Sequence, residues 1–182
     1  QRLIALLGEL IDIENLQSGS IVLRKAELNP ADLINQSIVL LREMALAKGG
    51  EIKIVSATET IIVADFDRLL RVLTNLIGNA IKFSNNGTAI AVGCQIKASS
   101  QSAEGNFLEF FVQNKGKPIP EDMQEKIFLR FEQVDQKSDT KKQAGTGLGL
   151  FICKEIVTAH GGQIWVNSTA SEGTIFSFTI PQ

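Results

Sequence analysis

Segments with β-strand character and segments with helical character follow one another irregularly along the 182 residues of this chain. Apolar residues recur at helical spacing in the longer segments, and short β-rich runs lie between these segments. A doubly wound parallel sheet would need regular alternation of strands and helices, which this sequence does not have. The order therefore predicts an α+β two-layer sandwich, in which a mixed β-sheet is covered on one face by helices.

The boundaries of these elements follow from turn residues and from apolar spacing. We expect helices at residues 1–17, 30–48, 65–83, 120–128 and 145–160. We expect strands at residues 20–25, 51–56, 60–64, 88–97, 107–113, 163–168 and 174–180. Residues 132–144 are polar, so we expect them to be mobile. The chain starts inside a helical pattern without Met, which indicates a fragment of a larger protein, with residues 1–19 as a helix remnant and 20–182 as one domain.

Charge and composition argue against two classes of protein. The formal net charge is −2 and there is no dense Lys/Arg run, so we expect no nucleic-acid partner. No apolar run approaches the ~18 residues that would indicate a membrane-spanning helix. Cys94 and Cys153 lie in apolar segments and are expected to be buried thiols in a reducing compartment.

Three glycines alternate in Gly-Thr-Gly-Leu-Gly-Leu, residues 145–150, which opens the helical pattern that runs to His160. Glycine allows a sharp turn, and the first N–H groups of a helix are unpaired and attract anions such as phosphate. A flexible loop that merely caps the helix is the alternative. The stretch matches neither the P-loop pattern nor GxGxxG, and it follows a polar run rather than an apolar strand.

The helix expected at residues 65–83 carries a second polar signal. Asn75, Asn79 and Lys82 are spaced so that they share one stripe of the helix, beside apolar positions. Asparagine is a poor helix former, so two of them within a helix need a reason. An Asn oxygen can ligate Mg²⁺ and a Lys ammonium can bind phosphate, whereas a solvated polar face is the alternative.

Several motifs in a fixed order resemble sensor histidine kinases. Asn-Leu-Ile-Gly-Asn-Ala-Ile-Lys-Phe-Ser, residues 75–84, resembles their N box, and Ile-Phe-Leu-Arg-Phe, residues 127–131, resembles their F box. Residues 145–150 resemble the G2 box, and Glu-Gly-Thr at residues 172–174 resembles the last glycine box. Residues 3–19 resemble the end of the second dimerisation helix. The resemblance covers essentially the whole chain.

The resemblance implies a Bergerat-type fold that binds ATP and Mg²⁺ and transfers the γ-phosphoryl group to a histidine. It implies that Asn79 binds the metal and that Asn75, Lys82 and Arg130 serve the transfer. The nucleotide would contact the following residues: Asn79, Lys82, Phe83, Asn114, Gly116, Ile119, Phe131, Gly145, Thr146, Gly147, Leu148, Gly149, Leu150 and Thr174.

The sequence departs from the family pattern at the adenine-reading box, which has the form Asp-x-Gly-x-Gly. Asn114 stands at the Asp position and Pro118 at the second Gly position. Loss of the charge and of one N–H implies a loss of ~1–3 kcal/mol in nucleotide binding. A weak or non-binding relative that acts as a protein-interaction module is therefore the second hypothesis. An ATPase of the same fold, such as a chaperone or mismatch-repair protein, is a third, but it would not be expected to carry residues 3–19.

His160 is the only histidine, and its place at a helix end indicates a structural role. The phospho-acceptor histidine is therefore expected upstream, on the protein's own dimerisation domain. The resemblance further implies a response regulator as partner, a homodimeric full-length protein and a cytoplasmic catalytic domain. This fragment, which has only part of one dimerisation helix, is expected to be monomeric.

Overall fold

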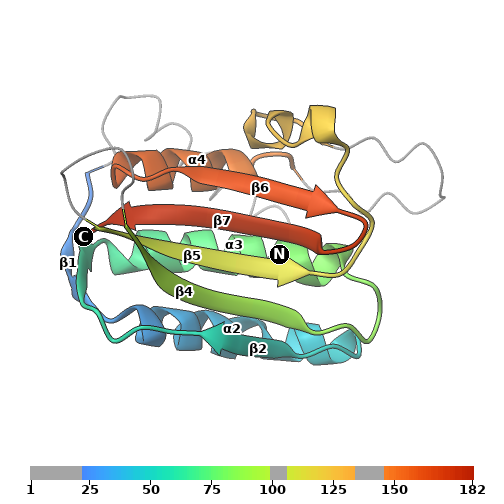
Figure 1. Ribbon diagram of the computed structural model, residues 1–182, viewed down its shortest axis with the longest axis horizontal. Coiled ribbons are helices and arrows are strands. Elements are labelled where there is room, and N and C mark those ends of the chain that lie inside the picture. The colour runs from blue at the N-terminus through green and yellow to red at the C-terminus, as the bar shows by residue number, and fades with distance from the viewer. Residues whose placement is uncertain (1–21, 99–105, 134–145) are drawn as a thin grey trace.

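The computed structural model describes residues 22–98, 106–133 and 146–182, and in them a five-stranded sheet with helices packed on one face (Figure 1). The strand order is β2-β4-β5-β7-β6. The five strands are β2 (Ile52–Ser56), β4 (Ile90–Ala98), β5 (Asn106–Asn114), β6 (Ile164–Thr169) and β7 (Gly173–Pro181). β2 pairs with β4 in parallel and the other pairs are antiparallel, so the sheet is mixed as predicted.

In the described part of the chain, three α-helices form the second layer behind this sheet (Figure 1). They are α2 (Pro30–Ala47), α3 (Phe66–Phe83) and α4 (Gly149–Ala159). Asn29 caps α2 through its side-chain oxygen, with Pro30 in the first turn, and the Asp65 carboxylate accepts a hydrogen bond from the backbone N–H of Arg68 at the start of α3. The predicted α+β sandwich with helices on one face is confirmed.

The core lies between the two layers. Alternate residues of β5 and β7 point towards the helices, and the rings of Phe110 and Phe178 stack there with centroids 4.9 Å apart. Leu69, Leu73 and Leu76 of α3 are fully buried in the same core cluster. Because the apolar stripe of α3 faces the core, the polar residues of this helix lie on its other faces.

A two-stranded sheet stands apart from the main one. It joins β1 (Ala26–Leu28) to β3 (Ile62–Ala64) in antiparallel register. The strand predicted at residues 20–25 is wrong over its described part, because residues 22–25 are not in a strand. The backbone N–H of Arg24 donates to the Asp65 carboxylate instead of to a strand partner.

Two other boundaries also differ from the predictions. The helix predicted at residues 145–160 begins only at Gly149, because Gly147 has a left-handed backbone with φ of 72° that cannot continue a helix. The helix predicted at residues 120–128 is two single 3₁₀ turns, η1 (Glu121–Met123) and η2 (Lys126–Phe128). The predicted helix at residues 1–17 and most of the predicted mobile segment at residues 132–144 lie outside the described residues.

Candidate functional site

The polar stripe of α3 faces the start of α4. Asn75, Asn79 and Lys82 are all half-buried, as expected of a stripe between apolar positions. The Asn75 amide donates a hydrogen bond to the Cys153 sulfur of α4 at 3.1 Å. The two helices therefore meet at Asn75, and this contact brings two of the predicted motifs together.

The position of the Asn75 side chain leaves no room for any residue larger than glycine at Gly149, the first residue of α4. A Cβ atom at Gly149 would lie 2.7 Å from both the oxygen and the nitrogen of the Asn75 side-chain amide. The first N–H groups of α4 begin beside this amide, and a helix leaves such groups without intrahelical partners. The contact therefore places anion-attracting backbone groups next to the polar stripe.

The loop before α4 is tied to the F-box motif. The backbone N–H of Phe131 donates to the carbonyl of Gly147 at 3.0 Å, and a Cβ atom at Gly147 would lie 2.7 Å from the Phe131 backbone. Phe131 itself has a φ of 63°, and its side chain is exposed. Thr146 accepts a hydrogen bond from the N–H of Leu148, which is buried, while Leu150 is half-buried. Gly145 lies outside the described residues.

Arg130 lies beside the same helix start. Its guanidinium carbon is 4.5 Å from the centre of the Phe151 ring on α4, an arrangement typical of a cation–π contact. The side chain is exposed, so the guanidinium keeps donors for an anion. Phe151 was not predicted as a site residue, and its aromatic character alone gave no signal for this contact.

Lys82 is the cation of the polar stripe. Its ammonium lies 4.7 Å from the centre of the Phe83 ring. Partial burial lowers the pKa of Lys82 through loss of hydration. An ammonium that has lost water on folding is favourably placed to gain a phosphate oxygen as a partner.

Residues of the predicted adenine-reading end gather where β5 and β7 meet. Asn114 is buried at the end of β5 and lies opposite Thr174 of β7. The Thr174 hydroxyl is 2.6 Å from the Ser168 hydroxyl, which accepts a hydrogen bond from the Ile119 N–H at 2.9 Å. Ser168 was missed by the sequence analysis, because nothing in its local pattern separates it from other strand serines.

The same end of the site touches the end of α3. A Cβ atom at Gly116 would lie 2.1 Å from the carbonyl oxygen of Phe83, and Gly116 forms an isolated β-bridge with Ser84. The structure therefore joins the predicted site residues at both ends of the polar stripe. Asn75 meets α4 at one end, and Phe83 meets the loop that follows Asn114 at the other.

The donor set suits Mg²⁺ held mainly by a nucleotide. Among the residues that the structure describes, no group of three or more His, Cys, Asp and Glu side chains could hold a metal on its own. Mg²⁺ is often bound through one or two protein oxygens together with substrate phosphates and water. The amide oxygen of Asn79 is a ligand type that fits such a role.

Cys153 and His160 are titratable groups whose pKa values are shifted by burial. Burial raises the pKa of Cys153 to about 12, so this thiol stays protonated beside Asn75. His160 is buried, with Nε2 accepting a hydrogen bond from the Asp65 N–H at 3.0 Å and Nδ1 2.8 Å from the Ile156 carbonyl oxygen. Burial lowers the pKa of His160, which thus links α3 to α4 as a neutral ring. This arrangement supports the structural role predicted for it.

Comparisons with known proteins agree with this geometry. Residues 64–182 match the family model described as "Histidine kinase-, DNA gyrase B-, and HSP90-like ATPase". The chain is 34% identical over 180 residues to hybrid signal transduction histidine kinase D of Dictyostelium discoideum, covering 98% of this chain and 11% of that protein. It is 36% identical over 156 residues to the adaptive-response sensory kinase SasA of Prochlorococcus marinus, covering 85% of this chain and 39% of that protein.

A solved structure resembles the fold over nearly the whole chain. Full-length ShkA in complex with AMPPNP superposes with a TM-score of 0.83 at 28% identity, covering 99% of this chain and 36% of that one. The chain thus spans well under half the length of these relatives. Within its described residues, no helix is both long and apolar enough to span a membrane. The family match and the arrangement of the boxes agree: this chain belongs to the histidine kinase-, DNA gyrase B- and HSP90-like ATPase family.

Proposed function

We propose that this chain binds Mg-ATP along the polar stripe of α3 and presents its γ-phosphoryl group to a histidine of a dimerisation domain. The observation that carries the proposal is the contact of Asn75 with Gly149, since it sets the polar stripe against the start of α4. The similarity to ShkA, which was solved with the ATP analogue AMPPNP, supports the same ligand class. The sequence motifs by themselves do not connect the two helices.

Each residue has a role that follows from its place. Asn79 would hold Mg²⁺, which when bound neutralises phosphate charge. Lys82 and Arg130 would bind phosphate oxygens, and the N–H groups of Gly147 and Gly149 would add neutral donors to the same anion. Asn75 would line the phosphate side. Phosphoryl transfer depends mainly on positioning and on such charge stabilisation, so these groups account for the chemistry that the domain has to supply.

The adenine would lie at the other end of the stripe, against the Asn114 and Thr174 side of the sheet. Gly116, Ile119 and Phe83 border this end. The Asn114 amide offers one carbonyl acceptor to the adenine amino group, where the family pattern has a carboxylate. The neutral acceptor makes weak nucleotide binding the expected departure of this domain from its relatives.

The second candidate function is a protein-interaction module with little or no nucleotide binding. Asn114 and Pro118 favour it, because they change the adenine-reading box, whereas the intact phosphate-side residues favour nucleotide binding. The two functions differ in a simple measurement. Calorimetric titration with AMPPNP, with and without Mg²⁺, is expected to show binding that Mg²⁺ strengthens, and Asn79→Ala is expected to remove the Mg²⁺ dependence. No binding up to millimolar nucleotide would contradict the first function and leave the interaction module as the candidate.

We also propose the wider setting of the domain. The acceptor histidine would lie on the protein's own dimerisation domain, and a response regulator would receive the phosphoryl group. The full-length protein would be a homodimer and the catalytic domain cytoplasmic, whereas this fragment would be monomeric. A sizing column tests the last point, since a stable dimer of the fragment would contradict it.

A further inference from the structure

The C-terminal turn of α3 connects both ends of the candidate nucleotide site. Lys82 extends from this turn on the phosphate side, and the Phe83 carbonyl contacts the loop at Gly116. A helix leaves its last carbonyl groups without intrahelical donors, and they carry partial negative charge. The position of this turn therefore depends on what pairs with its carbonyl oxygens.

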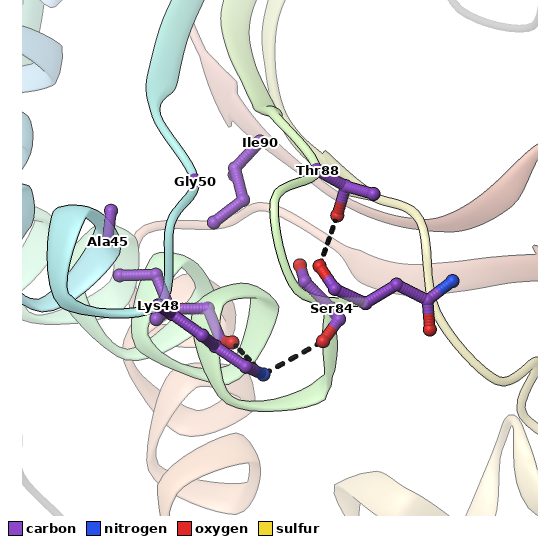
Figure 2. Close-up of a pocket in the computed structure, with 8 residues that line it drawn as sticks. Ala45, Lys48, Gly50, Ser84, Thr88 and Ile90 are labelled. Carbon is purple, nitrogen blue, oxygen red and sulfur yellow. Dashed lines mark hydrogen bonds between the residues drawn. The ribbon is translucent and has the colours of Figure 1, made fainter.

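Lys48, the residue that follows α2, provides the donors. Its ammonium lies 2.7 Å from the Ile81 oxygen, 2.7 Å from the Lys82 oxygen and 2.8 Å from the Ser84 oxygen. Figure 2 shows the Lys48 side chain reaching from the end of its helix towards Ser84. An ammonium has three donors, so this contact uses all of them on backbone oxygens of one turn.

The surroundings of Lys48 leave little freedom to the turn. The pocket beside it has a volume of about 10 Å³, which is room for about one water molecule, and Ala45, Ile81 and Ile90 contribute to its lining. The carbonyl of Lys48 also accepts a hydrogen bond from the Gly87 N–H at 3.3 Å. The space is too small for a nucleotide or metabolite, which indicates a structural contact rather than a second binding site.

We propose that Lys48 is a positioning residue for nucleotide binding, which acts by fixing the last turn of α3. This inference rests on the proposed function, because it assigns Lys48 a part in that same site. Lys48 binds the backbone of Lys82, and Lys82 directs its own ammonium over the Phe83 ring at 4.7 Å. A cation from α2 stabilises the helix end, so the cation within the last turn remains available to phosphate.

The same contact extends to the adenine end. Ser84, whose carbonyl oxygen Lys48 binds, forms the bridge with Gly116, and the Asn85 N–H donates to the Lys115 oxygen at 2.8 Å. Loss of the Lys48 ammonium would leave the carbonyl oxygens of this turn without their donors, and the β-bridge between Ser84 and Gly116 would then loosen. Lys48 thus orders both the phosphate cation and the loop after Asn114.

Amide hydrogen exchange without nucleotide tests the structural half of this proposal. Lys48→Met is expected to speed exchange of the Ser84 and Asn85 amides by about tenfold relative to amides in the middle of β5, because local opening becomes easier. Lys48→Arg keeps the charge and is expected to restore most of the protection. Lys53→Met is the control, since Lys53 is an exposed lysine paired with Glu51. Unchanged exchange in Lys48→Met would overturn the proposal.

Nucleotide titration tests the functional half. Lys48→Met is expected to weaken AMPPNP binding about fivefold or more under conditions where the protein stays folded, as expected for loss of a positioned ionic contact. The weakening should become smaller in a Lys82→Met background, because Lys48 then has no phosphate cation left to position and acts only through the loop after Asn114. Fully additive effects would show that Lys48 does not act through Lys82 and would overturn the proposal. Failure of the unmodified chain to bind AMPPNP would refute the proposed function, and the exchange result would then decide the role of Lys48 in the fold.

Discussion

The departure at Asn114 gives a prediction in which stability and affinity change in opposite directions. Asn114 is 3% exposed at the end of β5, opposite Thr174. Replacing the amide by a carboxylate in Asn114→Asp puts a charge into this buried position. The free energy of unfolding is expected to fall by about 1–3 kcal/mol, the usual penalty for a buried polar group without a full set of partners.

Nucleotide affinity is expected to rise in the same variant. A hydrogen bond to a charged acceptor is stronger than one to a neutral acceptor by roughly 1–1.5 kcal/mol, which corresponds to about tenfold in the dissociation constant. Urea denaturation measures the loss in stability, and calorimetric titration with AMPPNP and Mg²⁺ measures the gain in affinity. The control is Asn106→Asp, which makes the same chemical change at the exposed start of the same strand and should alter neither quantity by much.

The pH dependence of Asn114→Asp gives a second check on the same reasoning. Burial raises the pKa of a carboxyl group above its unfolded value, so the folded variant would hold its proton to higher pH. The destabilisation should therefore be smaller at pH 5 than at pH 8. A folded variant with unchanged affinity would refute the placement of Asn114 at the adenine end, whatever happens to its stability.

Three further predictions concern glycine, histidine and cysteine positions. Gly78→Ala is expected to raise the free energy of unfolding by about 0.5–1 kcal/mol, because a Cβ atom in this helix interior meets no atom within 4 Å. Gly162→Ala is expected to lower the free energy of unfolding, because its Cβ atom would overlap the Thr179 carbonyl. Thermal denaturation of both variants checks these expectations. Burial lowers the pKa of His160, so the unfolded chain binds the proton at higher pH than the folded chain. The free energy of unfolding should therefore decrease as the pH falls below 6.5. Urea denaturation should show a weaker pH dependence of this free energy in His160→Gln. Cys94 and Cys153 are buried, so a thiol reagent at pH 8 should label neither quickly in the folded protein and both in urea, and rapid labelling of the native protein would contradict the packing.

Local sequence signals were sufficient to predict an element whose own residues carry a clear periodic pattern. The apolar stripe of α3 predicted the helix to within one residue, and with it the shared face of Asn75, Asn79 and Lys82. The alternating glycines correctly marked the start of α4 as special, but not its first residue. Gly147 has a positive φ and leaves no room for a Cβ atom beside the Phe131 backbone, and local spacing reveals neither constraint.

Contacts between distant segments could not be predicted in this way. Lys48 lies more than thirty positions before the carbonyl groups that it binds, and its own neighbourhood suggests only a helix end followed by glycines. Ser168 similarly joins Thr174 to Ile119 from a strand whose pattern predicts nothing but packing. Such residues acquire their roles from strand order and helix docking, which are properties of the assembled sheet.

The hydrogen bond between Phe131 and Gly147 has a consequence for how this family of domains can vary. It holds together the two ends of the connection from the F box to α4. Once the ends of a loop are fixed, its closure entropy grows only with the logarithm of its length, so doubling the number of residues costs about 0.6 kcal/mol. Insertions and deletions between these two anchors are therefore expected to be nearly neutral for folding, which leaves the length and sequence of this connection open to selection for other properties.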